Sequence, residues 1–271
     1  MDNRKIGVFD SGLGGLSVVK EMKKYMPEES IVYFGDTARL PYGSKSKESI
    51  IRFSKQIMRF LTEHDVKAVI IACGTASSNA LEALKECYDL PIIGVVEPGA
   101  EAAARDTRNG NVGVLGTAAT INSRAFERLI HQCDASVNVI SQACPMFVPL
   151  VEEGWFEDDV TRQIAARYLA PLKEAGVDTV VLGCTHYPLL KRVIGEEFGD
   201  EVKLVNVSKE AVLKMKEYLA ANGLQADPEK EGAQADYEFY ASDSIDHMRE
   251  FGERVVGLEG LKVEKINIEK Y

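Results

Sequence analysis

The stretch AVIIACGTASSNALEAL (68–84) decides the fold of this chain, because a short run of apolar residues leads directly into a segment of helical character. Such a run is typical of a buried strand in a parallel sheet. The segment TVVLGCTHYPLLKRVIG (179–195) repeats the pattern, and Cys184 stands in it where Cys73 stands in the first. The two stretches therefore predict two equivalent strand–helix units.

Similar Val- and Ile-rich runs alternate with helix-like stretches along the rest of the chain. Apolar residues at a period near 3.6 predict helices over 44–63 and 158–175. The predicted strands are 6–10, 31–36, 68–73, 92–96, 111–116, 137–141, 179–184 and 202–207, followed by a polar surface loop at 225–236 and terminal strands within 237–242 and 261–268. This alternation predicts an α/β fold with mostly parallel sheets flanked by helices.

The strand order recurs at an offset of about 106 to 111 residues, which indicates an internal repeat. GVFDS (7–11) aligns with GVLGT (113–117), and AVIIACGT (68–75) aligns with TVVLGCTH (179–186). The strand sequences of any two parallel-sheet halves have a similar composition, so composition alone does not establish a repeat. A cysteine at the same strand end in both halves favours a true repeat. We expect two similar lobes that enclose a site in the crevice between them, residues 1–97 with 210–271 forming the first and residues 98–209 the second.

Composition limits the classes of function. The chain has 271 residues, of which 45% are hydrophobic, so it can fill a core and is not disordered. It carries 32 basic and 42 acidic side chains without a basic patch, which argues against nucleic-acid partners and anionic membranes. No stretch approaches the ~18 consecutive apolar residues of a membrane span, and the start has no secretory apolar region. We expect a soluble cytoplasmic protein.

The five cysteines are an odd number at irregular spacings, which predicts free thiols rather than a disulfide framework. Cys87, Cys133 and Cys144 lie in contexts that indicate packing or surface roles. Cys73 and Cys184 lie at strand ends, where α/β sheets bind ligands. One such thiol alone is more often buried and inert, but two at matching positions point to a reactive pair. A helix start after each is expected to favour the thiolate over the free thiol, whose pKa is about 8.5.

Other polar side chains accompany the two thiols at strand ends. Asp10 ends the first strand in IGVFDSGLGG, and His186 lies close enough to the second cysteine to assist proton transfer. Glu152 is expected near the crevice. The loop DTARLPYGSKS (36–46) and the segment GTAATINS (116–123) add hydroxyls and amides. Such a set can bind a carboxylate and an ammonium group without a metal or an organic cofactor.

Two other kinds of site fit the sequence less well. Gly12 and Gly14, with Asp36 at the end of the next strand, approach a dinucleotide-binding fingerprint. However, Ser17 stands at the third glycine position, and the carboxylate of Asp10 would oppose a pyrophosphate. An ordinary tight turn explains this segment better than a nucleotide does. A zinc site built from the two strand-end cysteines and the nearby histidine lacks a C-x-x-C or H-x-x-x-H spacing.

Six motifs occur in a fixed order between residues 7 and 207: DSGLGG, DTAR-x-PYG, AC-x-TAS, GT-x-x-T, CP-x-FVPLVE and GCTHYPLL. In this order they resemble the bacterial glutamate racemases of the aspartate/glutamate racemase superfamily. The resemblance implies a cofactor-independent enzyme that interconverts L- and D-glutamate, supplies D-glutamate for peptidoglycan and often forms homodimers. A racemase of aspartate or another small amino acid, and a non-catalytic binding protein of this fold, remain alternatives.

The resemblance also assigns roles to individual residues. It implies that Cys73 deprotonates D-glutamate with help from Asp10, and that Cys184 deprotonates L-glutamate. His186 and Glu152 would assist Cys184. The substrate contacts that it implies are Ser11, Pro41, Tyr42, Gly43, Gly74, Thr75, Thr117, Thr120 and Thr185. The family usually has Asn where this chain has Gly74, so we expect weaker substrate binding or altered selectivity, which a Gly74→Asn variant should reverse.

Overall fold

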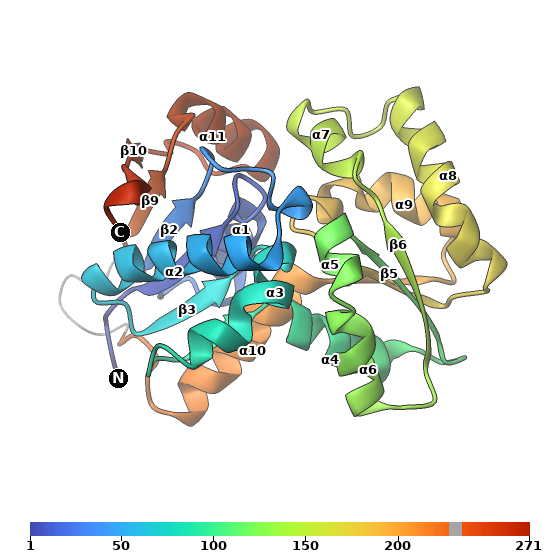
Figure 1. The fold of residues 1–271 in the computed structure, drawn as a ribbon, viewed down its shortest axis with the longest axis horizontal. Coiled ribbons are helices and arrows are strands. Elements are labelled where there is room, and N and C mark those ends of the chain that lie inside the picture. Colours follow the sequence, from blue (N-terminus) through green and yellow to red (C-terminus); the bar gives the residue numbers. More distant parts are fainter. Residues whose placement is uncertain (228–234) are drawn as a thin grey trace.

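The structure, a computed structural model, describes residues 1–227 and 235–271 and consists of two α/β lobes that lie side by side (Figure 1). The first lobe contains a six-stranded sheet of order β10-β9-β2-β1-β3-β4, in which neighbouring strands are parallel. Its strands are β1 (Ile6–Asp10), β2 (Ile31–Gly35), β3 (Ala68–Ile71), β4 (Ile92–Gly94), β9 (Tyr237–Ala241) and β10 (Val263–Lys265). The loop expected at 225–236 falls largely on 228–234, outside the described residues.

Helices cover both faces of this sheet, because successive residues of a strand point to opposite faces. Ile6 and Val8 belong to an apolar cluster that includes α1, α10 and α11, whereas Phe9 belongs to a second cluster with α2 and α3. These helices are α1 (Leu16–Tyr25), α2 (Lys47–Glu63), α3 (Gly74–Lys85), α10 (Val207–Ala221) and α11 (Ile245–Phe251), and the short helical turns are η1 (Tyr42–Ser44), η3 (Gly252–Val256) and η4 (Ile268–Lys270). Helix α2 confirms the helix predicted over 44–63.

The second lobe contains a four-stranded parallel sheet of order β6-β5-β7-β8. Its strands are β5 (Asn111–Gly116), β6 (Asn138–Ala143), β7 (Thr179–Leu182) and β8 (Lys203–Asn206). Its helices are α4 (Val96–Asp106), α5 (Ala118–Asn122), α6 (Ala125–Cys133), α7 (Phe147–Glu152), α8 (Asp159–Glu174) and α9 (Lys191–Phe198), with the turn η2 (Tyr187–Leu190) before α9. The expected α/β class with two parallel sheets is therefore confirmed.

The two sheets share a common arrangement of four strands. The order β2-β1-β3-β4 in the first lobe corresponds to β6-β5-β7-β8 in the second. The pairing is also equivalent, because Phe9 lies opposite Ile71 and Leu115 lies opposite Leu182. Strands β3 and β7 end two residues before their cysteines, earlier than predicted, because the chain leaves each sheet there to begin a helical segment. The repeat seen in the sequence is thus a repeat of strand order and register.

The chain passes between the lobes through α4 and α10. Helix α4 packs against β7 and β8 of the second lobe, while α10 contacts both α4 and α1 (Figure 1). The boundary expected after residue 97 therefore falls inside a helix rather than in a loop. Among the described residues, no helix has both the length and the apolar character needed to cross a membrane.

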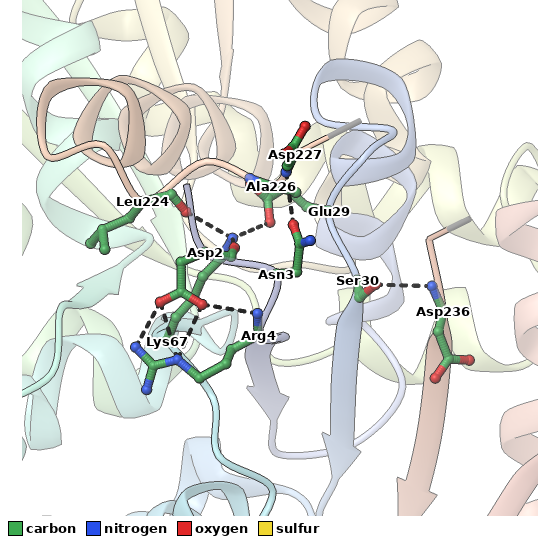
Figure 2. A network of polar contacts seen from close by, with 10 residues as sticks. All are labelled: Asp2, Asn3, Arg4, Glu29, Ser30, Lys67, Leu224, Ala226, Asp227 and Asp236. Carbon is green, nitrogen blue, oxygen red and sulfur yellow. Dashed lines mark hydrogen bonds and ion pairs between the residues drawn. The ribbon is translucent and has the colours of Figure 1, made fainter. Parts of the chain in front are cut away.

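A buried ion pair between Lys67 and Glu29 lies at the amino ends of the strands in the first lobe (Figure 2). Lys67 lies 2.6 Å from the Glu29 carboxylate and donates hydrogen bonds to the carbonyl oxygens of Asp2 and Leu224. The other Glu29 oxygen accepts from the backbone amide of Ala226. Removing one partner of a buried pair costs about 3–5 kcal/mol. This network joins the N-terminus and the segment after α10 to the sheet, at the end away from the strand-end cysteines.

Candidate active site

A cavity of about 400 Å³ lies between the lobes and contains both strand-end cysteines. Two larger hollows, of about 780 and 1330 Å³, contain neither. The predicted site residues that line the cavity are Asp10, Ser11, Pro41, Tyr42, Gly43, Cys73, Gly74, Thr75, Thr117, Glu152, Cys184, Thr185 and His186. Thr120 is buried behind this lining, where its hydroxyl lies 3.0 Å from that of Thr117. The structure therefore brings residues from both lobes into one site.

Asp10 ends β1 and is held in place by a glycine-rich turn that leads into α1. One of its oxygens accepts from the backbone amide of Gly12 at 2.9 Å, and the other accepts from the Thr185 hydroxyl of the second lobe at 3.3 Å. A Cβ atom on Gly15 would lie 2.5 Å from the Cβ of Asp10, so glycine is required there. Burial raises the pKa of Asp10, although the charge of His186 and the amides of the turn oppose the shift. The turn thus encloses a carboxylate rather than a phosphate.

Asp36, the other residue of the dinucleotide alternative, is fully buried and already has its own partners. Its carboxylate accepts hydrogen bonds from the Tyr42 hydroxyl, from Arg39 at 2.7 Å and from Ser242 at 2.8 Å. These contacts place Asp36 under the loop that carries Pro41. Its carboxylate is buried and therefore cannot bind the hydroxyl groups of a ribose. Tyr42 lines the cavity, and its hydroxyl donates a hydrogen bond to this carboxylate.

Cys73 is the N-cap residue of α3, and the hydrogen-bond partners of its sulfur both belong to the first lobe. The sulfur accepts from the backbone amide of Ala76 at 3.4 Å, and the thiol donates to the Ser11 hydroxyl at 3.4 Å. Burial and the neighbouring charge of Asp10 raise the pKa of Cys73 to about 12. The prediction that the helix N-terminus favours the thiolate is therefore wrong for Cys73, because burial and a nearby carboxylate outweigh the helix dipole.

Cys184 has a different set of neighbours. Its sulfur lies 3.8 Å from Nδ1 of His186, and Nε2 of the same ring lies 3.1 Å from a carboxylate oxygen of Glu152. Burial lowers the pKa of His186, but the hydrogen bonds to Cys184 and Glu152 raise it more, to about 10. The imidazole is therefore protonated at neutral pH and places a positive charge beside the sulfur. No full helix begins at Cys184, since the turn η2 precedes α9.

Three threonine hydroxyls, which we call the threonine cluster, join the lobes at the cavity. Thr75 of the first lobe lies 2.8 Å from Thr117 and 3.4 Å from Thr120, oxygen to oxygen. Thr117 also caps α5, because its hydroxyl accepts from the backbone amide of Thr120. The cluster presents hydroxyl groups from both lobes to the same part of the cavity, a suitable environment for a carboxylate.

The apolar wall of the cavity was not predicted from the sequence. Pro145, Val148 and Pro149 line it from the start and first turns of α7, the helix whose last residue is Glu152. Val148 is four residues before Glu152, so both lie on one face of the helix. This spacing within FVPLVE was the available signal, and it places an apolar surface next to the carboxylate that holds His186.

Gly74 leaves no space for a side chain. A Cβ atom at this position would overlap the backbone carbonyl oxygen of Gly183, the residue before Cys184. A backbone atom cannot rotate away as the end of a flexible side chain can. The expectation that Gly74→Asn would restore a substrate contact therefore meets a steric obstacle between the lobes.

The arrangement supports acid–base chemistry on both sides of one bound molecule. Cys73 and Cys184 come from different lobes and line the same cavity. One thiol is next to a carboxylate and the other is next to an imidazolium ion. Such a pair can remove a proton from one face of a carbon atom and deliver a proton to the opposite face.

Comparison with known proteins gives a consistent result along the chain. A family model described as Asp/Glu/Hydantoin racemase matches residues 6–214. The chain is 48% identical over 254 residues to a glutamate racemase of Geobacter metallireducens, a match that covers 94% of this chain and 93% of that protein. It is 45% identical over 266 residues to a glutamate racemase of Neisseria meningitidis, covering 98% and 97% of the two chains.

Solved structures give the same match in three dimensions. A glutamate racemase isoform from Bacillus anthracis has a TM-score of 0.94 at 36% identity and covers 98% of both chains. A glutamate racemase from Francisella tularensis, solved in complex with D-glutamate, has a TM-score of 0.92 at 37% identity and covers 100% of both. The similarity therefore includes both lobes and the site between them.

Proposed function

The chain belongs to the Asp/Glu/hydantoin racemase family, and on this premise we propose that it interconverts L-glutamate and D-glutamate by proton transfer between two cysteines. The observation that carries the proposal is the placement of Cys73 and Cys184. They follow equivalent strands of two similar lobes and line one cavity from both sides. A binding protein has no need of two such thiols.

In the L-to-D direction, Cys184 acts as a thiolate and removes the α-proton of L-glutamate. The electron pair of the broken C–H bond stays on the α-carbon and is shared with the adjacent carboxylate. The Cys73 thiol then donates its proton to the opposite face, which gives D-glutamate and leaves Cys73 as the thiolate. The D-to-L direction is the same sequence reversed, so each thiol serves as base once and as acid once.

The neighbours of each thiol support this division of work. A protonated His186, held by Glu152, stabilises negative charge on the Cys184 sulfur. Asp10 has the opposite effect on Cys73, because a carboxylate beside a thiolate makes the thiolate a stronger base. Cys73 is therefore suited to hold a proton in the free enzyme and, as the thiolate, to remove one from D-glutamate.

Binding of an anionic substrate must depend on local groups, since the net charge of the chain is −10. Among the described residues that line the cavity, His186 is the one protonated cationic side chain. The remaining proposed contacts are the side chains of Ser11, Tyr42, Thr75, Thr117 and Thr185 and the backbone at Pro41, Gly43 and Gly74, while Thr120 supports the Thr117 hydroxyl from behind. Hydrogen bonds from neutral donors to an ionised group contribute about 1.5–3 kcal/mol each.

Aspartate is the alternative substrate, because it differs from glutamate by one methylene group. A hydrophobic pocket separates substrates that differ by one methylene by only about 1–3 kcal/mol. The relatives with high identity are glutamate racemases, whereas an aspartate racemase of Picrophilus torridus has a TM-score of 0.57 and 16% identity. These identities favour glutamate.

Exchange of the α-proton in heavy water tests the proposal directly. The reduced protein, without added cofactor, is incubated with each enantiomer of glutamate and of aspartate, and deuterium incorporation and enantiomeric composition are followed. We expect inversion of both glutamate enantiomers, with deuterium in the product, and slower turnover of aspartate. Folded protein that neither exchanges nor inverts any of the four substrates would refute a racemase function.

The setting of the enzyme is also part of the proposal. D-glutamate would serve peptidoglycan synthesis in the cytoplasm, where the five free thiols remain reduced. Met146, Trp155 and Val160 are large apolar side chains exposed on the second lobe, and we propose that two copies of the chain associate. Light scattering during size-exclusion chromatography tests this, since a mass near 29.8 kDa at micromolar concentration would contradict a dimer.

The two lobes are further proposed to move as units, residues 1–97 with 210–271 against residues 98–209. Sheet composition supports this division, because β9 and β10 join the first sheet while β5 to β8 form the second. A site between two lobes must open to admit glutamate. Small-angle scattering with and without glutamate tests this, because an unchanged radius of gyration would contradict lobe movement.

A further inference from the structure

The two loops that carry the cysteines touch backbone to backbone. Gly74 is the first residue of α3, directly after Cys73, and a Cβ atom there would overlap the carbonyl oxygen of Gly183. Gly183 directly precedes Cys184 and is itself confined, since its own Cβ would lie 2.5 Å from the carbonyl oxygen of Leu115. Neither Gly74 nor Gly183 therefore has room for a side chain at this contact.

Other contacts between the lobes are more compliant. A Cβ on Gly43 would lie 2.9 Å from the Cβ of Thr117, and a Cβ on Gly14 would overlap the side chains of Thr185 and His186. The Thr185 and His186 side chains can change rotamer, and the overlap at Gly43 is smaller than that at Gly74. The loop at Gly183, in contrast, is anchored to β5 by the hydrogen bond from its amide to the carbonyl oxygen of Leu115. The Gly74 contact is thus the rigid one.

We propose that Gly74 is a positioning residue, whose backbone contact with Gly183 limits the closure of the lobes and sets the separation of the two catalytic sulfurs. This inference rests on the proposed racemase function. Both sulfurs must reach the same α-carbon from opposite faces, and each must come within about 3–3.5 Å of its target. A side chain at position 74 would hold the lobes apart at the point nearest both thiols.

A wider gap has a specific chemical consequence. Either cysteine can still take an α-proton, exchange it with solvent and return a deuteron to the same face. Delivery from the opposite cysteine becomes slow, because the intermediate must be reached across a longer distance. A misplacement of about 1 Å can lower a rate by about 100-fold. Exchange without inversion should therefore increase relative to inversion.

The experiment compares the full-length wild type with Gly74→Ala, Gly74→Asn and Gly195→Ala in heavy water. For each protein, deuterium in the remaining L-glutamate is measured against formation of D-glutamate, together with kcat, KM and the thermal midpoint. Gly195→Ala is the matched control, because its Cβ would meet only a Leu204 methyl carbon, at 3.9 Å, within the second lobe.

We expect Gly74→Ala to lower kcat at least tenfold and to raise the ratio of exchange to inversion at least tenfold, with a near-native thermal midpoint. Gly74→Asn should be no better than Gly74→Ala. Gly195→Ala should match the wild type. A general structural defect would lower exchange and inversion together, so an unchanged ratio in a folded Gly74→Ala protein overturns the proposal.

Two further outcomes are decisive. Tighter glutamate binding by Gly74→Asn at an unchanged kcat would overturn the proposal, because the added side chain would then fit. If Gly74→Ala does not fold, Gly43→Ala is measured instead; a ratio raised about twofold supports the proposal, and an unchanged ratio overturns it. A wild type without racemase activity would instead refute the proposed function, so the two failures are distinguishable.

Discussion

Cys73 and Cys184 occupy equivalent positions in the backbone but opposite electrostatic surroundings. Both follow the third strand of a four-stranded unit, and both units have the same strand order. Cys73 lies in the field of a buried carboxylate, Asp10, while Cys184 lies 3.8 Å from the imidazole of His186. The fold repeats the position of the thiol, and individual side chains then determine the acid–base character of each.

The aligned repeat shows where the two lobes differ. The residue equivalent to Asp10 is Gly116, and the residue equivalent to His186 is Thr75. Each lobe therefore supplies one of these two ionisable groups, Asp10 beside Cys73 in the first lobe and His186 beside Cys184 in the second. Burial and Asp10 raise the pKa of Cys73 to about 12, and the contacts of His186 raise its pKa to about 10. At neutral pH the free enzyme holds a proton on Cys73 and a positive charge beside Cys184, which is the form that L-glutamate requires.

This asymmetry cannot change the ratio of the two overall efficiencies. The enantiomers of glutamate have equal free energy in solution, so kcat/KM must be the same in both directions at every pH. The difference between the thiols must instead be sought in separate measurements of each sulfur: isotope exchange, chemical modification and primary isotope effects.

The largest effect should follow removal of either thiol. Cys73→Ala and Cys184→Ala should each lower racemisation by about 10⁴-fold, the upper range for loss of a general acid or base. The comparison predicts a difference between them in heavy water: Cys73→Ala should retain α-proton exchange only with L-glutamate, and Cys184→Ala only with D-glutamate. The reverse pattern would contradict the assignment of faces, and full racemisation by either variant would contradict the two-base mechanism.

Chemical modification should separate the thiols by at least about 100-fold, because the thiolate is the reactive species. Iodoacetamide at pH 7.5 should modify Cys184 before Cys73. Modification of Cys73 should accelerate about tenfold per pH unit up to pH 10, since its pKa of about 12 lies above that range.

Peptide mass spectrometry measures both modification rates in one sample. The exposed residues Cys87 and Cys133 provide internal standards for an ordinary thiol. Faster modification of Cys73 than of these standards at pH 7.5 would contradict the raised pKa. Loss of the preference in a His186→Asn variant would show that the imidazolium ion is its source.

Removing the charged neighbours should have effects of about 10- to 100-fold on kcat, smaller than loss of a thiol. His186→Asn should slow proton transfer at Cys184 and so increase the primary isotope effect with α-deuterated L-glutamate. Asp10→Asn should do the same with the D-enantiomer, because it affects Cys73. Equal changes for both enantiomers in both variants would contradict separate half-sites.

Much of this comparison could be predicted from sequence, because it depends on local order. The strand-end positions of Cys73 and Cys184 follow from the Val- and Ile-rich runs before them, and the repeat predicts that both face one crevice. The lining of the cavity by Asp10, His186 and Glu152 agrees with the resemblance to racemases. These features require only the pattern of strands and helices.

Other features depend on how the lobes pack, and the sequence does not contain this information locally. The helix after Cys73 predicts a favoured thiolate, but burial and the charge of Asp10 reverse that effect. From the sequence, Gly74 is a position that lacks the family's usual side-chain amide. Its contact with Gly183 shows that a side chain has no space there. The resemblance implies a substrate contact at Thr120 of the motif GT-x-x-T, yet this residue lies behind Thr117 and outside the cavity lining.

The smallest expected effect concerns Thr75, the position equivalent to His186. Thr75→Val removes a hydroxyl that bonds to Thr117 across the lobes and lines the cavity. Loss of a hydrogen bond to an ionised substrate costs about 1.5 kcal/mol at the lower end of the range, and a water molecule in place of the hydroxyl can restore part of it. KM for both enantiomers should therefore rise by up to about tenfold while the isotope effects stay unchanged. Thr120→Val is the matched control, because this hydroxyl belongs to the same cluster but does not line the cavity, and its KM should change less. If the isotope effect changed for one enantiomer only, Thr75 would act on Cys73 in the way that His186 acts on Cys184. The two half-sites would then be more alike than their charges suggest.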